Sequence, residues 1–301
     1  MTKPYQNRLV GYACALGVTA IWSGNFIVAR GLNESIPPIS LAFWRWVVAI
    51  IVFLPFALKA LIAEWNVLKK HISYLSITSF LGITTFNSLI YIAGQTTTAI
   101  NLSLISITFP IFIVILLRIF YQEAITANKG IGILLVVGGV ILLITKGEPS
   151  KILNLTFAVG DSWMLAAALI FAIYSILLKR KPKELSVMAF QLSTFLLGLV
   201  FLFPFFLWES AITPSIQFET KTVLAILYIG VFAALIAFLL WNKAILIIGP
   251  ANAGMIYYTL PLFSGFLAYL ILSEAISSVH FYSVLLIVSG IVIANRQRKN
   301  R

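Results

Sequence analysis

Long apolar segments follow one another along the whole chain, and short polar segments separate them. A helix that crosses a bilayer needs roughly 20 predominantly apolar residues. The pattern predicts ten such helices, at about 9–30, 38–58, 72–94, 97–118, 128–145, 159–179, 186–207, 222–243, 250–272 and 280–296. Pro37-Pro38 precedes the second segment and Gly249-Pro250 separates the eighth from the ninth, in positions typical of helix starts. The sequence therefore predicts an all-α membrane protein of ten transmembrane helices.

Composition supports this interpretation. Hydrophobic residues make up 61% of the 301 residues and charged residues only 10%, whereas soluble domains average roughly half and a quarter. Too few charged groups remain to cover a surface that faces water. The ten helices also leave no room for a soluble catalytic domain. The one cysteine, Cys14, excludes an intramolecular disulfide and a cysteine metal cluster.

The net charge of +12 reflects membrane topology, and we expect no nucleic-acid partner. With the N-terminus in the cytoplasm, about sixteen basic residues fall on the inside and four on the outside. Cytoplasmic loops carry an excess of Lys and Arg, so this bias predicts that both termini are cytoplasmic and that the number of helices is even. The apolar run 9–29 is too long for a typical signal-peptide core, and we interpret it as the first helix.

The two halves of the chain repeat each other. A shift of 151 residues places Pro110 on Pro261 and Glu123 on Glu274, and a shift of 149 places Trp22 on Phe171. The other informative matches at 151 are Asn101 with Asn252, Thr108 with Thr259 and Gly139 with Gly290. Because five helices is an odd number, the second half enters the membrane from the opposite side, as in many secondary transporters. We predict a first repeat at 1–146, a linker at 147–158 and a second repeat at 159–301.

Several motifs resemble those of the EamA family in the drug/metabolite transporter (DMT) superfamily, over about residues 9–296. They are Ile21-Trp22-Ser23-Gly24-Asn25-Phe26 on the first helix, Arg45 within Phe43-Trp44-Arg45-Trp46 on the second, Gly160-Asp161 before the sixth, and the two prolines of Phe109-Pro110 and Leu260-Pro261 with the glutamates that follow them. Phe171 departs from the family pattern, in which tryptophan is common. The resemblance implies a ten-helix carrier of the bacterial inner membrane with a central cavity. Such carriers move amino acids, other small metabolites or drugs, often outward.

Polar and aromatic side chains recur on the first, third, fourth, sixth, eighth and ninth helices, and the resemblance places the cavity among the same six. Polar groups are costly in lipid and usually face the bundle interior. The candidate substrate-binding residues are Trp22, Asn25, Asn87, Tyr91, Asn101, Phe171, Tyr174, Trp241, Asn242, Tyr257 and Tyr258. This lining suits an amino acid, an amine or a related metabolite. Alternatives place Trp241 in an interfacial belt and let Asn101 bond a neighbouring helix, and only one of the adjacent Tyr257 and Tyr258 can face inward easily.

Five further residues are candidates for gating or structural roles: Arg45, Pro110, Pro261, Glu123 and Glu274. The prolines interrupt the backbone hydrogen bonding of their helices. They are either bends that let a gate move or static kinks. The glutamates lie near helix ends. Each could control a gate by its charge, serve as a proton site, or cap a helix at the interface. Arg45 lies about seven residues into its helix, where it snorkels outward or pairs with a carboxylate such as Glu34.

Enzymatic motifs such as HExxH, GxSxG, the P-loop and CxxC do not occur. We expect a secondary carrier that works by alternating access in the lipid bilayer, as a monomer or weak dimer, without enzymatic activity, cofactor or metal. One alternative is a polytopic membrane enzyme or lipid flippase that acts on a lipid-linked substrate. Such an enzyme or flippase should have acids or histidines clustered near the membrane interface. In this sequence His71 and His280 are far apart. A scaffold or receptor is a further alternative, which needs no inverted repeat.

Overall fold

The computed structural model describes residues 3–31, 35–97, 102, 105–145, 147–148, 150, 158–213, 216, 218–263, 266 and 278–295. These residues form helices joined by turns and short connections, and they contain no strand. The all-α prediction is therefore confirmed for the described part of the chain.

The helices are, in chain order, α1 (Lys3–Gly31), α2 (Pro38–Ala63), α3 (Trp65–Lys70), α4 (Ile72–Ser79), η1 (Phe80–Thr85), α5 (Phe86–Thr96), α7 (Thr108–Tyr121), α8 (Ala127–Ile144), α10 (Val159–Leu177), η2 (Leu178–Arg180), α11 (Val187–Ile212), α12 (Thr220–Tyr228), η3 (Ile229–Ile236), α13 (Ala237–Tyr257) and α15 (Ser278–Asn295). Within the described residues, six continuous helical stretches are long and apolar enough to cross a membrane, and two apolar helices are shorter. The count of ten and the cytoplasmic placement of the termini stay predictions.

Two helices extend beyond their predicted ends. The predicted segments end at 58 and 207, but α2 continues to Ala63 and α11 to Ile212. Each contains a proline, Pro55 or Pro204, that the helix absorbs without ending, and the two prolines are 149 positions apart. By contrast, the predicted break at Gly249 is confirmed, because this residue has the non-helical angles φ 79° and ψ 159°. Glycine adopts a positive φ without the steric cost of a Cβ atom.

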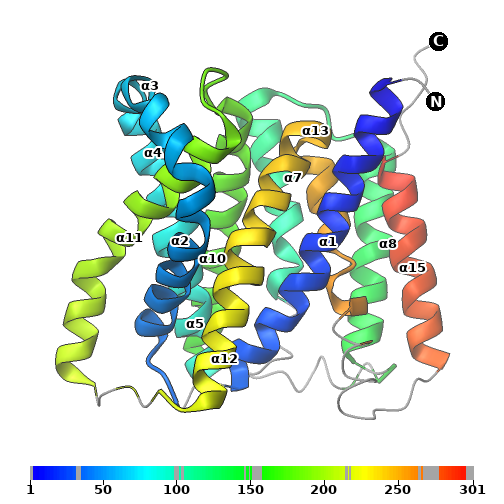
Figure 1. Cartoon of the computed structure of the whole chain (residues 1–301). Coiled ribbons are helices and arrows are strands. Elements are labelled where there is room, and N and C mark those ends of the chain that lie inside the picture. The colour runs from blue at the N-terminus through cyan, green and yellow to red at the C-terminus, as the bar shows by residue number, and fades with distance from the viewer. Residues whose placement is uncertain are drawn as a thin grey trace.

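Figure 1 shows α2 and α11 at one edge of the bundle and α8 and α15 at the other, with α1, α10 and α13 between them. The main pairings are α1 with α13, α10 with α5, α2 with α11, and α8 with α15. A shift of about 150 residues turns the pair α1 with α13 into the pair α10 with α5. The same shift relates α2 to α11 and α8 to α15, so each of these two pairs corresponds to itself. An approximate two-fold relation between the halves requires this pattern. The predicted limits of the halves stay a prediction.

The pairing of α8 with α15 depends on small residues. A Cβ atom on Gly132 would lie 2.6 Å from the Gly290 carbonyl oxygen, and one on Gly290 would lie 2.7 Å from the Gly132 oxygen. A Cβ atom on Gly139 would lie 3.0 Å from the Ser283 oxygen. Small residues let membrane helices approach closely enough for backbone packing. Since a shift of 151 maps Gly132 to Ser283 and Gly139 to Gly290, the two contacts are equivalent.

Two glutamates join α2 and α11 at their opposite ends. Glu209, near the end of α11, accepts hydrogen bonds from the Ile39 and Ser40 amides of α2 at 3.0 and 2.6 Å, and from Ser40 Oγ at 2.7 Å. Glu64, directly after α2, accepts from the Ser186 amide before α11 at 2.8 Å. The first amides of a helix have no partner within the helix, and they favour negative charge. The carboxylate at the end of each helix therefore binds backbone amides at the start of the other.

Removing the Glu209 carboxylate should destabilise the fold. In Glu209→Ala the buried amides at the start of α2 lose their acceptor, so we expect unfolding to become easier by roughly 1–3 kcal/mol. Thermal unfolding in detergent micelles measures the change. Glu219→Ala is the matched control, because Glu219 is exposed and makes no side-chain cap. Equal melting temperatures for the two variants would contradict this account of the cap.

Gly132→Ala should also lower the melting temperature, by the equivalent of about 1–3 kcal/mol, because its Cβ would overlap the α15 backbone. Gly138 is on the same helix, but a Cβ atom there would meet nothing within 4 Å. Gly138→Ala should therefore leave the melting temperature unchanged or raise it, since alanine favours helix. Loss of stability in both variants would mean that helix α8 itself, and not the contact, is sensitive.

Candidate functional site

Arg45 of α2 is buried, with 1% of its surface exposed. Its Nη1 donates to Asn87 Oδ1 and to Tyr91 Oη, both at 2.7 Å, and its Nη2 donates to the Ala233 carbonyl at 3.0 Å. The interpretation that Arg45 snorkels outward is wrong, because these bonds hold its guanidinium inside the bundle. Glu34, the other partner considered, lies outside the described residues.

The Ala233 carbonyl is available because η3 is a π-helix. In an α-helix the Ala237 amide would bond to the carbonyl four residues before it. Here that amide donates to Phe232 and Ala234 instead. The free carbonyl accepts from Trp22 Nε1 at 3.0 Å as well as from Arg45. Single π-helical turns often occur at functional sites.

The second π-helix, η1, begins 149 residues before η3 and frees a carbonyl in the same way. The Phe86 amide donates to Leu81, five residues before it. The Gly82 carbonyl then accepts from Asn87 Nδ2 at 3.4 Å. The position of Asn87 beside Arg45 therefore also depends on a widened turn.

Tyr91 completes the group, because its hydroxyl donates to Asn25 Oδ1 at 3.3 Å. Asn25, Arg45, Asn87 and Tyr91, with the Ala233 carbonyl, form what we call the polar cluster. It brings together three predicted substrate-binding residues and one predicted gating or structural residue, from α1, α2 and α5. The cluster holds one positive charge among uncharged partners.

An aromatic cluster adjoins it through Trp22. The Trp22 ring lies 5.4 Å from Phe171, 5.5 Å from Trp241 and 6.2 Å from Tyr257, measured between centroids. Further rings in this cluster, which sequence reasoning missed, are Phe86, Phe109 and Phe238. The predicted aromatic residues of the two halves therefore pack against one another. Trp241 is fully buried, so its interpretation as part of an interfacial belt is wrong.

Tyr174 and Asn242, both predicted site residues, bond to each other. The Tyr174 hydroxyl donates to Asn242 Oδ1 at 3.0 Å, and Asn242 Nδ2 donates to Gln191 Oε1 at 2.5 Å. Trp241 Nε1 donates to Ser175 Oγ at 3.1 Å. These bonds link α10, α11 and α13 behind the aromatic cluster, and neither Gln191 nor Ser175 was among the predicted residues.

Tyr257 and Tyr258 separate as adjacent helical residues should. The Tyr257 ring lies 5.0 Å from Phe109, and its hydroxyl is hydrogen-bonded to Ser106. Tyr258 is buried, but its hydroxyl has no hydrogen-bond partner and its ring makes no ring contact within the described residues. The prediction that one of the two faces the centre is confirmed for Tyr257.

The centre of the bundle is closely packed as far as the described residues extend. Among these residues lies a cavity of about 10 Å³, which is room for about one water molecule. It is lined by Phe86, Ile90, Ser106, Phe109, Met164, Ala168, Phe171 and Tyr257. Among the described residues, aromatic rings therefore occupy the place predicted for the central cavity.

Both predicted proline bends are breaks in helical structure. Thr108 Oγ1 bonds to the Ile105 carbonyl at 2.6 Å just before Pro110, and Thr259 Oγ1 bonds to the Ile256 carbonyl at 2.8 Å just before Pro261. A turn replaces the helix at Ile107 and at 258–259. The helix is interrupted just before each proline, and the role of these positions as moving bends or static kinks stays a prediction.

Glu123 forms an ion pair between the two halves. Lys179 Nζ lies 2.7 Å from Glu123 Oε1 and 4.4 Å from the centre of the Tyr121 ring. Gln122 adopts the left-handed conformation that ends α7, with φ 53°, and turns the chain toward η2. After η2, burial lowers the pKa of the Lys181 amine, which donates to the Pro182 carbonyl at 3.2 Å. Glu274 and Asn101, the remaining predicted residues, lie outside the described residues.

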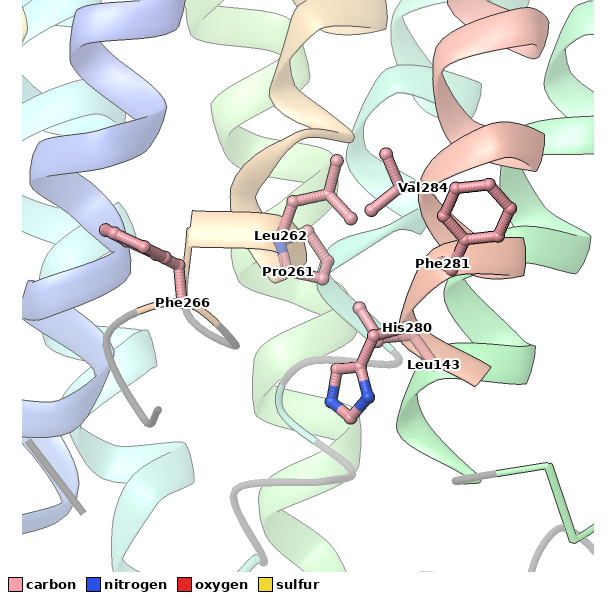
Figure 2. A pocket seen from close by; sticks show the side chains of 7 residues that line it. All are labelled: Leu143, Pro261, Leu262, Phe266, His280, Phe281 and Val284. Atoms are coloured by element: carbon pink, nitrogen blue, oxygen red, sulfur yellow. The ribbon is translucent and has the colours of Figure 1, made fainter. Parts of the chain in front are cut away.

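A larger hollow of about 260 Å³ lies beside Pro261. Figure 2 shows its lining, which is Leu143, Pro261, Leu262, Phe266, His280, Phe281 and Val284. Apart from His280 these side chains are apolar, so the hollow offers few groups for specific recognition. Among the described residues, no group of three or more His, Cys, Asp or Glu side chains could hold a metal ion.

A matched pair of substitutions compares Tyr174, whose hydroxyl is hydrogen-bonded, with Tyr258, whose hydroxyl has no partner among the described residues. Tyr174→Phe should destabilise the protein by about 1–2 kcal/mol, because the buried Asn242 oxygen loses its donor. Tyr258→Phe should have no cost, since the Tyr258 hydroxyl has no partner to lose. Melting temperatures in detergent test this, and a larger loss in Tyr258→Phe would contradict the assignment.

Comparison with known proteins gives consistent results. An uncharacterized transporter of Archaeoglobus fulgidus is 28% identical over 268 residues, which cover 84% of this chain and 86% of that protein. The uncharacterized transporter YetK of Bacillus subtilis is 26% identical over 297 residues, covering 98% and 89%. A solved crystal structure superposes with a TM-score of 0.74 at 19% identity, covering 97% of this chain and 96% of the other, and shows the fold alone.

The model of the EamA-like transporter family matches the chain twice, at residues 9–145 and 158–296. Together the two matches cover nearly the whole sequence, including α2 with Arg45, and all the helices that carry the two clusters. The motifs, the helical bundle and this double match agree, and the chain belongs to the EamA-like transporter family.

Proposed function

We propose that this protein is a secondary transporter of small metabolites, amino acids or related compounds, that works as an exporter by alternating access. The observation that carries the proposal is the aromatic contact between the halves, where Trp22 of α1 meets Phe171 of α10 and Trp241 of α13. A carrier must close around its site between the two open states, and contacts of this kind between the two halves suit such a closure.

The proposed architecture is ten helices in two inverted repeats, 1–146 and 159–301, in a bacterial inner membrane with both termini cytoplasmic. The double family match, the exchange of helix pairs by the 150-residue shift and the charge bias support it. Figure 1 adds that the first and last described residues lie at the same end of the bundle. In this orientation the Glu123–Lys179 ion pair lies at the cytoplasmic end.

The two halves are proposed to rock about the centre. The breaks at Pro110 and Pro261 occupy equivalent positions and let the helix ends beyond them tilt. At the cytoplasmic end, the Glu123–Lys179 pair and the Glu64 cap both join one half to the other. At the other end, the Glu209 cap does the same. Export, in preference to import, is supported by the family resemblance.

Flux into proteoliposomes tests the proposal directly. Purified protein should accelerate counterflow of at least one labelled solute from a panel of amino acids, amines, sugars and nucleosides, above protein-free liposomes. Trp22→Ala should reduce that flux by roughly 10-fold or more, because it opens the closure and removes a lining residue. Absence of flux for the whole panel would count against a transporter of small metabolites.

Cross-linking tests the cytoplasmic gate. In a Cys14→Ala background, Glu123→Cys with Lys179→Cys replaces the ion pair, and a short bifunctional thiol reagent should join the two positions. Flux should stop after cross-linking and return after reduction, because the halves can no longer separate there. Each single cysteine variant, treated in the same way, controls for modification alone. Full flux through completely cross-linked protein would exclude a gate at this position.

A further inference from the structure

The positive charge of Arg45 has no negative partner among the described residues. Of the nine acidic residues of the chain, two, Glu34 and Glu274, lie outside those residues. The buried acids are occupied elsewhere: Glu209 caps α2, and Asp161 accepts from the Ala158 amide and from Thr97. A charge in a membrane interior is costly unless it is paired. The polar cluster offers Arg45 only uncharged acceptors.

The guanidinium also keeps an unused donor. It has five N–H groups, and the structure shows two bonds from Nη1, one from Nη2 and none from the buried Nε. Nε and Nη2 together form one edge of the planar group. Carboxylates bind arginine at such an edge through two parallel hydrogen bonds. Among the described residues, Nε is therefore a buried donor without an acceptor, on the edge that suits a carboxylate.

The surroundings favour a particular shape of solute. The Ala233 carbonyl accepts from both Arg45 and Trp22, so the guanidinium and the indole lie next to each other. Beyond Trp22 are the rings of Phe171, Trp241 and Tyr257. A carboxylate at Arg45 would therefore have aromatic rings near the rest of its molecule, and such rings pack well with apolar groups.

We propose that Arg45 binds the carboxylate of the transported solute, so that the substrates are small carboxylic acids, including zwitterionic amino acids, with an apolar or aromatic remainder. This inference rests on the proposed function and narrows it, because it excludes amines that lack an acidic group. The bound carboxylate supplies the counter-charge that the described residues lack and engages the free Nε. Arg45, counted from sequence among the gating or structural residues, thereby becomes a substrate-binding residue.

The experiment measures the flux of three related solutes in proteoliposomes: an amino acid, its carboxamide and its decarboxylated amine. The comparison is made for alanine, for leucine and for phenylalanine. Wild-type protein should carry at least one acid roughly 10- to 100-fold faster than its amide or amine, the range expected for a charged hydrogen-bonded pair. Arg45→Gln should reduce the flux of the acid to that of its amide. Arg118→Gln, which removes an exposed arginine of α7, should change neither.

A second variant keeps the test decisive if Arg45→Gln does not fold. Asn87→Asp places a carboxylate where the Asn87 oxygen lies 2.7 Å from Nη1, and so supplies a counter-charge within the protein. This variant should have a melting temperature at or above that of wild type. Its acid flux should fall roughly 10-fold, because the built-in carboxylate competes with the substrate, while amide flux persists.

The outcomes separate the two proposals. Amines or amides carried as fast as the acids by wild type, or acid flux unchanged in both variants at normal protein level, would overturn the role of Arg45 and leave the transporter standing. Absence of flux for every solute tested, including neutral sugars and nucleosides, would overturn both. Acid preference that is lost with Arg45 and weakened in Asn87→Asp establishes the site.

Discussion

The hydrogen bonds to the Ala233 carbonyl are the interaction on which the centre of this protein depends. In the hydrocarbon region no water can satisfy a polar group, so each donor and acceptor needs a partner in the protein. The π-helical turn of η3 releases this carbonyl from its own helix, and Trp22 and Arg45 use it. Three elements, α1, α2 and η3, therefore meet at one oxygen atom, and the rotation of each about its axis is fixed there.

The two clusters divide the centre by chemistry. The polar cluster holds a charge in fixed dipoles, and the aromatic cluster excludes water next to it. Low dielectric strengthens electrostatic interactions with the guanidinium, and it also makes an unpaired charge costly. The same arrangement is therefore stable only with good hydrogen bonding and is sensitive to the charge of any molecule that enters. The capped pair of α2 and α11 supports it, because Arg45 lies on α2, whose first turn Glu209 fixes.

Sequence reasoning anticipated the helical class, the breaks at Gly249 and at the two prolines, and the meeting of Trp22, Asn25, Asn87 and Tyr91. These follow from local rules, since polar groups avoid lipid and proline lacks an amide hydrogen. One of the three partners of Arg45 was not accessible in this way, because it is a backbone carbonyl 188 residues away that only a π-helix exposes. Glu64 and Glu209 were missed for a related reason, because they accept hydrogen bonds from backbone amides at the start of a helix that is distant in sequence. One signal was present, since each glutamate follows the second apolar segment of its half.

The Glu209 cap has a consequence for biogenesis. The amides at the start of α2 are inserted early, but the carboxylate that satisfies them is 169 positions later in the chain. At ordinary rates of translation that interval is on the order of 10 to 30 seconds. During this interval the first turn of α2 must rely on lipid headgroups, water or the insertion machinery. Assembly of the first half thus stays incomplete until the second is synthesised, and a ribosome that stalls between them leaves a nascent chain with an uncapped helix for quality control to recognise.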